Sequence, residues 1–214
     1  MTIEGYGVWL EPLDADHIEM VRQWRNSQKI NTYMEYRDYI SPEMQQAWFA
    51  KLNPLTDFYF LIKYNERYVG LIHTSNVDWQ AGTAEAGLFI YEDHYLSTPI
   101  PVFASLSMVD AFFLYFPVNK LYAKVMTGNA VAEQYNQSLG FKLMPNQEGL
   151  QFKRFVLDKA DYFASASQLR SAAQILERDS IKVHFDYSHY QALLAMGLQV
   201  SDNLIVKEDA KSVQ

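Results

Sequence analysis

The centre of the chain holds three extended segments that follow one another with only short breaks between them. They read FYFLIKY, YVGLIHTSNV and AEAGLFIY, and they are rich in aromatic and β-branched residues. Such residues favour strands, and the breaks at residues 65–67 and around Gly82 are short enough for turns between neighbouring strands. The segments therefore predict an antiparallel meander.

A strand and two helices are predicted ahead of this meander. The strand is GVWLEPL, and the first helix follows it with Asp14 or Asp16 as its cap and an end near Asn26. Ser41 and the proline after it are typical of a helix start, and the second helix runs from there to about Asn53.

A helix, a strand, a second helix and two more strands are predicted after the meander. The first helix runs from about Pro101 to Phe116 and is apolar enough to be buried. The strand LYAKVM, the helix NAVAEQYNQSLG closed by Gly140, and two strands within FKLM and LQFKRFVLD follow. This order predicts an α/β chain, more closely an α+β mixed sheet with helices on its faces.

The last part of the chain has a different pattern. The segment DYFASASQLRSAAQILERD predicts one amphipathic helix, IKVHFD alternates as a strand does, HYQALLAMG predicts a short helix that ends at Gly197, and NLIV predicts one more strand. The apolar side of the amphipathic helix consists of Phe163, Ala166, Leu169, Ala173 and Leu176. We expect frayed residues at the end, in KEDAKSVQ. A domain at 1–158 and an extension at 159–214, packed on it or forming an interface, are therefore predicted.

Composition narrows the classes of function. The 214 residues carry 18 Lys and Arg against 25 Asp and Glu, a net charge of -7, and no basic cluster, so we expect neither nucleic acid nor an anionic membrane as a partner. There is no cysteine, which excludes a disulfide framework, a thiolate nucleophile and cysteine zinc sites. The N-terminal segment lacks a basic start followed by an apolar run, and Asp110 interrupts the most apolar stretch, so a cytoplasmic protein is expected.

The segment NAVAEQYNQSLGF, with Asn129, Tyr135 and Gly140 at its characteristic positions, resembles the closing motif of the GNAT superfamily of acetyl-CoA-dependent N-acetyltransferases. The segments VRQWRNSQKINTYM, ISPEMQQAWFAKL, YFLIKYNERYVGLIHTSNV and AEAGLFIYEDHY are similar in order and spacing to the branch that contains ribosomal-protein and nucleotide-linked amino-sugar N-acetyltransferases. The resemblance covers residues 7–157 and leaves the rest of the chain unmatched.

The resemblance implies the GNAT fold, acetyl-CoA as co-substrate, and a primary amine as acceptor, on an amino sugar, a small amine or a peptide N-terminus. It places Tyr135 as the general acid, a role that a neutral phenol suits, and Asn129 beside the cofactor arm. The backbone of one strand would pair with the pantetheine arm, and its residues here are Leu88, Phe89, Ile90 and Tyr91. The alternative for Tyr135 is a packing role between its helix and the sheet.

On the acceptor side, the resemblance makes Glu85 the candidate general base and His73 a second candidate. Each has a plain alternative, because a strand glutamate is often only solvated and a strand histidine is often structural. Arg25, in the family's Trp-Arg-Asn sequence, is expected as an ion-pair or helix-end residue rather than a substrate ligand. Three tyrosines that follow form either an acceptor pocket or the edge of a lid: Tyr33, Tyr36 and Tyr39.

The turn after the third meander strand departs from the family. Where the family has Gln or Arg, two residues, Gly, one residue, then Gly or Ala, this chain has Leu96, Pro99 and Pro101 at the three motif positions. Proline has no N–H, and each hydrogen bond to a charged phosphate is worth about 1.5–3 kcal/mol. Two lost donors would therefore weaken binding by about 3–6 kcal/mol, a hundredfold to more than ten-thousandfold.

The residues left to hold the phosphates flank these prolines: Ser97, Thr98, Ile100 and Val102. Their alternative role is to cap the helix that follows. No Lys or Arg occurs from Tyr68 through Asn119, whereas five acids do, so cations would have to come from Lys120, Lys124 or the C-terminal residues. Acetyl-CoA is thus in doubt, and a GNAT-fold binding module with lost or altered CoA binding is the second hypothesis.

Metal chemistry is not expected from the pattern of histidines. The five histidines show no ligand-like spacing with carboxylates, and His184, Asp186 and His189 form the one exception. The C-terminal extension is open to three interpretations, as a homodimer surface, a lid or a partner-binding element.

Overall fold

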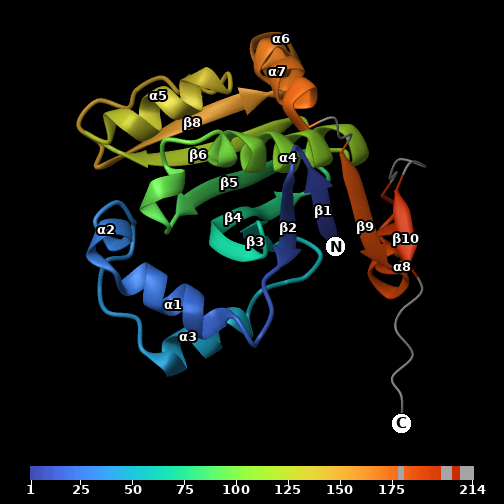
Figure 1. Ribbon diagram of the computed structural model, residues 1–214, viewed down its shortest axis with the longest axis horizontal. Coiled ribbons are helices and arrows are strands. Elements are labelled where there is room, and N and C mark those ends of the chain that lie inside the picture. Colours follow the sequence, from blue (N-terminus) through green and yellow to red (C-terminus); the bar gives the residue numbers. More distant parts are fainter. Residues whose placement is uncertain (178–180, 199–203, 208–214) are drawn as a thin grey trace.

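The computed structural model describes residues 1–177, 181–198 and 204–207, and its strands form one mixed sheet (Figure 1). The order across the sheet is β10-β9-β1-β2-β3-β4-β5-β6-β8-β7. The strands are β1 (Thr2–Gly5), β2 (Val8–Pro12), β3 (Phe58–Tyr64), β4 (Arg67–Asp78), β5 (Thr83–Ile90), β6 (Lys120–Met126), β7 (Lys142–Leu143), β8 (Phe152–Asp158), β9 (Lys182–Asp186) and β10 (Ile205–Lys207).

Helices cover both faces of the sheet. They are α1 (Ile18–Asn26), α2 (Gln28–Asn31), α3 (Pro42–Phe49), α4 (Ile100–Tyr115), α5 (Ala130–Ser138), α6 (Lys159–Ser165), α7 (Ser167–Glu177) and α8 (Tyr187–Ala195), with a short 3-10 turn η1 (Asp93–Tyr95). Figure 1 shows α1 and α3 on one side and α4 on the other. The predicted α+β mixed sheet with helices on its faces is confirmed.

The predicted antiparallel meander is formed by β3, β4 and β5 at the centre of the sheet. Thr74 of β4 pairs with Phe58 of β3 on one side and with Ala86 of β5 on the other. The turn between β3 and β4 holds Asn65 and Glu66 at φ of 47° and 59°. Two successive positive φ values occur in the two-residue turns whose twist matches that of the flanking strands.

The next strand pair is parallel and short. β5 pairs with β6 only from Thr83 to Glu85, opposite Lys120 to Tyr122. β6 then continues along β8 for its full length, and β5 continues along β4 to Ile90. The two strands therefore separate after Glu85, and residues 86–90 of β5 are not paired on that side with any strand that the structure describes. We call this stretch the splay.

The two faces of the sheet pack differently. On one face α4 is buried along nearly its whole length, as expected for a helix that is apolar all round. On the other face α1 packs a smaller cluster, in which burying each large apolar side chain contributes about 1.5–3 kcal/mol. The buried members of that cluster are Leu13, Ile18, Val21, Trp24, Leu61 and Leu71.

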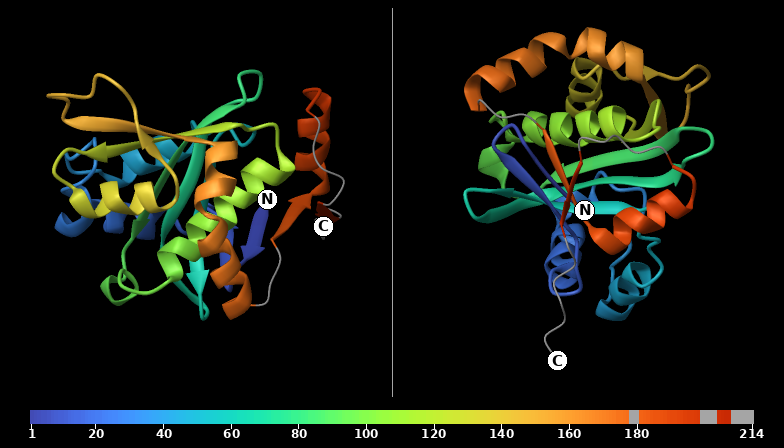
Figure 2. Two further views of the ribbon diagram at one scale, coloured as in Figure 1. Left: turned by 90° about the horizontal axis from the view of Figure 1, so that it is seen from above. Right: turned by 90° about the vertical axis from the view of Figure 1, so that its right-hand side faces the viewer.

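A buried carboxylate links the C-terminal extension to the core. Helices α6 and α7 lie over the outer side of α4 (Figure 2), where Asp110 is 1% exposed. Asp110 accepts hydrogen bonds from the hydroxyls of Tyr6 (2.6 Å) and Tyr162 (2.9 Å) and from Nε of Arg170 (2.9 Å). Every oxygen of this carboxylate has a donor, and we call these four residues the Asp110 cluster.

Strand β9 completes the other end of the sheet. It pairs antiparallel with β1, with Ile3 opposite Val183, and β10 pairs parallel to β9. The alternation predicted for IKVHFD is present, because Val183 and Phe185 are buried between more exposed neighbours.

Some expectations need correction. The segment predicted as one amphipathic helix forms two, because α6 ends at Ser165 and α7 begins at Ser167, and Leu176 of the expected apolar side is 65% exposed. Strand β1 and helix α2 were not predicted. Asn203 of the predicted NLIV strand and residues 208–214 of the predicted frayed end lie outside the described residues.

Within the described part of the chain, no helix combines the length and the apolar character that crossing a membrane requires.

Candidate active site

The splay places the predicted arm-binding strand beside the start of α4. Leu88, Phe89, Ile90 and Tyr91 follow the last pairing of β5 with β6, so their backbone on that side has no partner strand among the described residues. At Tyr91 the N–H donates to the carbonyl of Val69 of β4 (2.8 Å), on the opposite side, and the carbonyl accepts from Nζ of Lys29. Residues 88–90, predicted to pair with a pantetheine arm, therefore have no strand partner on the side of the splay among the described residues.

The turn before α4 fits a pyrophosphate poorly. The Thr98 hydroxyl donates to the carbonyl of Tyr95 (2.7 Å) and accepts from the N–H of Ile100 (3.3 Å), so both groups are used within the turn. Pro99 is the N-cap residue of α4 and Pro101 lies in its first turn. Ser97 and Val102 keep backbone N–H groups without a hydrogen-bond partner in the described chain. Of the four residues predicted to hold the phosphates, only two therefore keep a free backbone N–H within the described chain.

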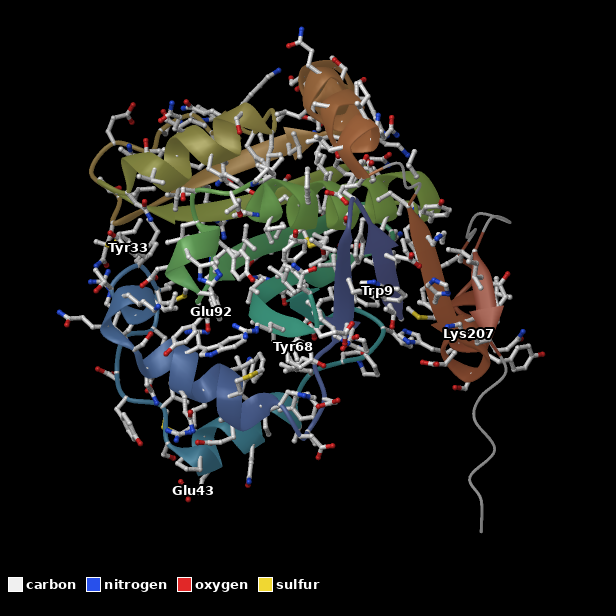
Figure 3. All side chains as sticks on the ribbon, in the orientation of Figure 1. Trp9, Tyr33, Glu43, Tyr68, Glu92 and Lys207 are labelled. Carbon is white, nitrogen blue, oxygen red and sulfur yellow. The ribbon has the colours of Figure 1, made fainter. Side chains whose placement is uncertain are left out.

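The charge around this turn is mostly negative. Glu92 lies just ahead of it, above α1 in Figure 3, and exposed Asp93 follows. Lys29 of α2 is the cation beside them, since its Nζ lies 3.0 Å from Oδ1 of Asp93 and 4.2 Å from the ring centre of Tyr91. Sequence reasoning did not find Lys29, because nothing in QKIN signals its contact with a turn more than sixty residues later.

Lys120 and Lys124, predicted as phosphate partners, both have carboxylate partners. Nζ of Lys120 lies 3.3 Å from Asp158, and Nζ of Lys124 lies 3.1 Å from Glu35. Each would have to leave its ion pair to meet a phosphate.

Tyr135 projects from α5 to the first turns of α4. Its oxygen lies 2.7 Å from the carbonyl oxygen of Pro101 and 2.7 Å from Oγ of Ser105. Because a carbonyl only accepts, the phenol donates to Pro101 and the Ser105 hydroxyl donates to the phenol. Burial raises the pKa of Tyr135, so the phenol is protonated at neutral pH.

Asn129 starts the same helix. Its side-chain oxygen accepts from the N–H of Ala132 (3.1 Å), which is the N-cap contact. Its side-chain amide has no hydrogen-bond partner within the described chain, so the predicted contact with a cofactor arm is compatible with the capping role.

Glu85 and His73 lie on the sheet face toward α1, because Phe89, four residues after Glu85 on the same side of β5, packs in the α1 cluster. His73 stacks on Tyr59 with ring centres 4.8 Å apart, and its Nδ1 lies 3.1 Å from Oγ of Ser75. A Cβ at Gly87 would lie 2.3 Å from Nε2 of His73, so the imidazole lies across that glycine. Burial, with the charge of Arg25, lowers the pKa of His73 to about 4.

Arg25 faces the same surface, whereas its neighbours on α1 hold the loop that follows. Arg22 donates to the carbonyl of Ile40 (2.9 Å), and Asn26 exchanges two hydrogen bonds of 2.9 Å with Ile40. Arg22 also pairs with Glu19 at 2.7 Å. Arg25, expected as an ion-pair or helix-end residue, lies in the last turn of α1 and forms neither a hydrogen bond nor an ion pair with any residue that the structure describes.

The three tyrosines of the α2–α3 loop are largely exposed. Tyr33, Tyr36 and Tyr39 are 50%, 45% and 69% exposed, and Figure 3 shows Tyr33 beside α2. The loop also reaches β6, through Glu35 with Lys124 and through Arg37, whose guanidinium lies 3.7 Å from Sδ of Met126. The loop therefore spans from α2 to β6, on the open side of the splay.

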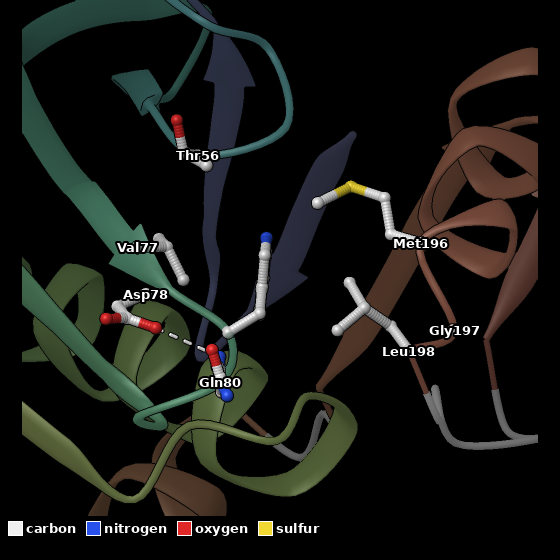
Figure 4. Close-up of a pocket in the computed structure, with 8 residues that line it drawn as sticks. Thr56, Val77, Asp78, Gln80, Met196, Gly197 and Leu198 are labelled. Carbon is white, nitrogen blue, oxygen red and sulfur yellow. Dashed lines mark hydrogen bonds between the residues drawn. The ribbon is translucent and has the colours of Figure 1, made fainter.

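Two cavities lie away from the splay. One of about 600 Å³ lies between the end of β4 and the residues after α8, with Thr56, Asp78 and Leu198 among its lining (Figure 4). One of about 280 Å³ lies near Trp9, Tyr68 and Lys207, which Figure 3 labels. Among the described residues, no group of three or more His, Asp or Glu side chains is arranged to hold a metal ion.

Comparison with solved structures shows the fold. At a TM-score of 0.61 and 12% identity, 72% of the chain covers 98% of RimL, a ribosomal L7/L12 α-N-protein acetyltransferase in complex with coenzyme A. FdhC, a nucleotide-linked sugar GNAT, matches with a TM-score of 0.65 and 17% sequence identity. The match covers 79% of this chain and 96% of FdhC. A spermidine N-acetyltransferase from Vibrio cholerae in complex with CoA and spermine matches with a TM-score of 0.63 and 16% sequence identity. The match covers 73% of this chain and 98% of that protein.

The curated proteins include no match to the chain. The family model described as an acetyltransferase (GNAT) domain matches residues 8–142, which is more than half of the chain and includes α1, the meander, the splay, α4 and α5. This match confirms the predicted resemblance: the chain belongs to the GNAT acetyltransferase domain family.

Proposed function

We propose that this protein is an N-acetyltransferase that transfers an acetyl group from acetyl-CoA to a primary amine. One observation carries the proposal, in a chain of this family: β5 leaves β6 after Glu85, which frees residues 86–90 of β5 beside the first turn of α4. An extended thioester arm can pair with such a free edge, with Tyr135 at the α4 side and Glu85 on the sheet face toward α1.

The chemistry requires a proton acceptor for the amine and a proton donor for the leaving thiolate. The amine nitrogen forms a bond to the carbonyl carbon, the C–S bond breaks, and the nitrogen loses a proton. Glu85 is the proposed acceptor of that proton, and Tyr135 the proposed donor to the sulfur. Tyr135 must turn from the carbonyl of Pro101 to donate, while its contact with Ser105 keeps it near α4.

We expect weak CoA affinity. The prolines, the internally bonded Thr98 and Ile100, and the acids Glu92 and Asp93 all act against the pyrophosphate. Calorimetric titration with coenzyme A and acetyl-CoA tests the proposal. Binding in the micromolar to millimolar range is expected, and no binding at millimolar ligand would contradict it.

Two variants locate the cofactor and the general acid. Replacing both Pro99 and Pro101 by glycine should tighten CoA binding by up to about 3–6 kcal/mol, if the restored N–H groups face phosphate. Tyr135→Phe should slow transfer with nearly unchanged CoA affinity, and Tyr64→Phe, whose hydroxyl lacks a bond within the described chain, is its control. Normal turnover in Tyr135→Phe would remove the general-acid assignment.

The second candidate is a GNAT-fold binding module with lost or altered CoA binding. The specific support for it is the pair Pro99 and Pro101 together with the acidic turn. The same titration separates the candidates, because a binding module of this kind gives no heat with either form of the coenzyme.

A further inference from the structure

Arg25 is a charged residue without a counter-ion in a place where charge is expensive. Its side chain is half-buried, its Nε is buried without a hydrogen-bond partner, and it forms no ion pair with the described residues. A partly desolvated charge that is left unpaired costs free energy, and buried polar groups in native structures normally have partners.

Contacts of the residues on either side fix the position of Arg25 at the end of α1. The preceding turn of α1 is fixed because Trp24 stacks on Tyr91, with ring centres 5.2 Å apart, and packs edge-on against Phe89. Asn26, the next residue, is bonded to Ile40 on the outer side. Arg25 is thus held between two anchored neighbours, close enough to Tyr59 and His73 for its charge to act on the pKa of both.

The carboxylate of Glu85 lies on this same sheet face and is also unpaired among the described residues. No ion pair joins it to Arg25, although the charges of both act on Tyr59. Tyr59 of β3 pairs with His73 of β4, and Ser75 of β4 pairs with Glu85 of β5, so Glu85 lies one or two strands from the residues on which the charge of Arg25 acts. Neighbouring strands are about 4.8 Å apart, so we take the distance between the two charged groups to be on the order of 5–10 Å.

We infer that Arg25 binds an anionic group of the acceptor, so that the acceptor is a primary amine that also carries a carboxylate or a phosphate about 5–10 Å from its nitrogen. The planar guanidinium suits either anion, because it can donate two parallel hydrogen bonds to two oxygens. The amine end of the same molecule lies toward Glu85. The identity of the amine end rests on the proposed function, whereas the anion contact does not need an acetyl donor.

Matched ligand pairs test this without coenzyme A. The phosphate pair is glucosamine 6-phosphate and glucosamine, and the carboxylate pair is 6-aminohexanoate and hexylamine. Binding to the full chain is measured by calorimetry or by NMR chemical-shift titration. At least one anion-bearing member should bind tenfold or more tightly than the partner that lacks the anion, and spermine should bind no better than hexylamine.

Variants assign the preference to Arg25. Arg25→Gln should make both members of the preferred pair bind alike, Arg25→Lys should keep part of the difference, and exposed Arg67→Gln should change nothing. The inference is overturned if the wild-type protein binds the members of each pair equally, if it binds neither anion-bearing probe at millimolar concentration, or if the preference survives Arg25→Gln. Absence of CoA binding in a protein that shows this preference would remove only the proposed function.

Discussion

Arg170 and Arg25 lie on opposite faces of the sheet, and their surroundings differ in one respect. Arg170 of α7 meets Asp110, which already accepts from two tyrosines, so its charge is matched. Arg25 of α1 has no carboxylate partner within the described chain, and its charge, together with burial, lowers the pKa of His73. The first arrangement stabilises the fold, and the second leaves binding free energy available for a ligand.

The largest expected effect is the difference in the free energy of unfolding between Arg170→Gln and Arg25→Gln. Arg170→Gln leaves Asp110 buried without its cation and should lower the free energy of unfolding by about 3 kcal/mol or more. Arg25→Gln removes an unpaired charge and should leave that free energy unchanged or raise it. Urea unfolding of both variants and the wild type measures the difference, and equal losses in the two variants would end the comparison.

A second effect of similar size is a pH dependence that comes from His73. Its pKa of about 4 lies below its ordinary value of 6.5, so between these values the unfolded chain binds a proton that the folded chain does not. The free energy of unfolding should therefore fall as the pH falls from about 6.5 to 4, by at most about 3 kcal/mol from this residue.

Arg25→Gln sharpens this test. Removal of the nearby positive charge should raise the pKa of His73, which NMR titration of the imidazole protons can follow. His73→Gln serves as the control, because it should remove this part of the pH dependence. A pKa of His73 that stays the same in Arg25→Gln would show that the guanidinium lies elsewhere.

A smaller loss is expected on the Asp110 side from Tyr162→Phe. The variant removes one hydrogen bond to a buried charge, which is worth about 1.5–3 kcal/mol, while Tyr6 and Arg170 still hold the carboxylate. Thermal and urea unfolding measure the loss. Exposed Tyr187→Phe is the control, and a Tyr162→Phe variant as stable as that control would show that the Asp110 cluster contributes little.

The smallest effect is expected at Lys29, whose ion pair with Asp93 is exposed. Lys29→Gln should change the free energy of unfolding by less than about 1 kcal/mol, as exposed ion pairs do. If Lys29 binds the phosphates of CoA, the same variant should lose more free energy of CoA binding than free energy of unfolding. Calorimetry of Lys29→Gln beside Lys51→Gln, an exposed lysine away from the turn, tests this.

Elements determined by their own residues were predictable from the sequence. Ser41 and Pro42 predicted the start of α3, and Oγ of Ser41 indeed accepts from the N–H of Met44 (3.2 Å). The alternation in IKVHFD predicted β9. The segment TIEG has no such signal, and β1 exists because β2 and β9 pair with its two edges. The division of the chain at residue 158 stays a prediction.

The site was predictable in its residue types but not in its contacts. The motif around Tyr135 predicted a general acid or a packing residue, yet its donation to Pro101 depends on a carbonyl 34 positions earlier in the chain. The isolation of Arg25 depends on Arg22 and Asn26 turning to Ile40, and short-range patterns do not reveal which arginine of a helix pairs. The roles of Glu85, Tyr135 and the phosphate turn stay predictions.

The pairing of β1 with β9 has a consequence for synthesis on the ribosome. Ile3 leaves the ribosome long before its partner Val183, so one edge of β1 has no partner while the residues between them are made. Exposed strand edges recruit other chains, which makes the nascent protein prone to aggregation until β9 is released. Ribosome stalling ahead of residue 182 should therefore yield nascent chains that bind chaperones, and stalling well past residue 186 should not.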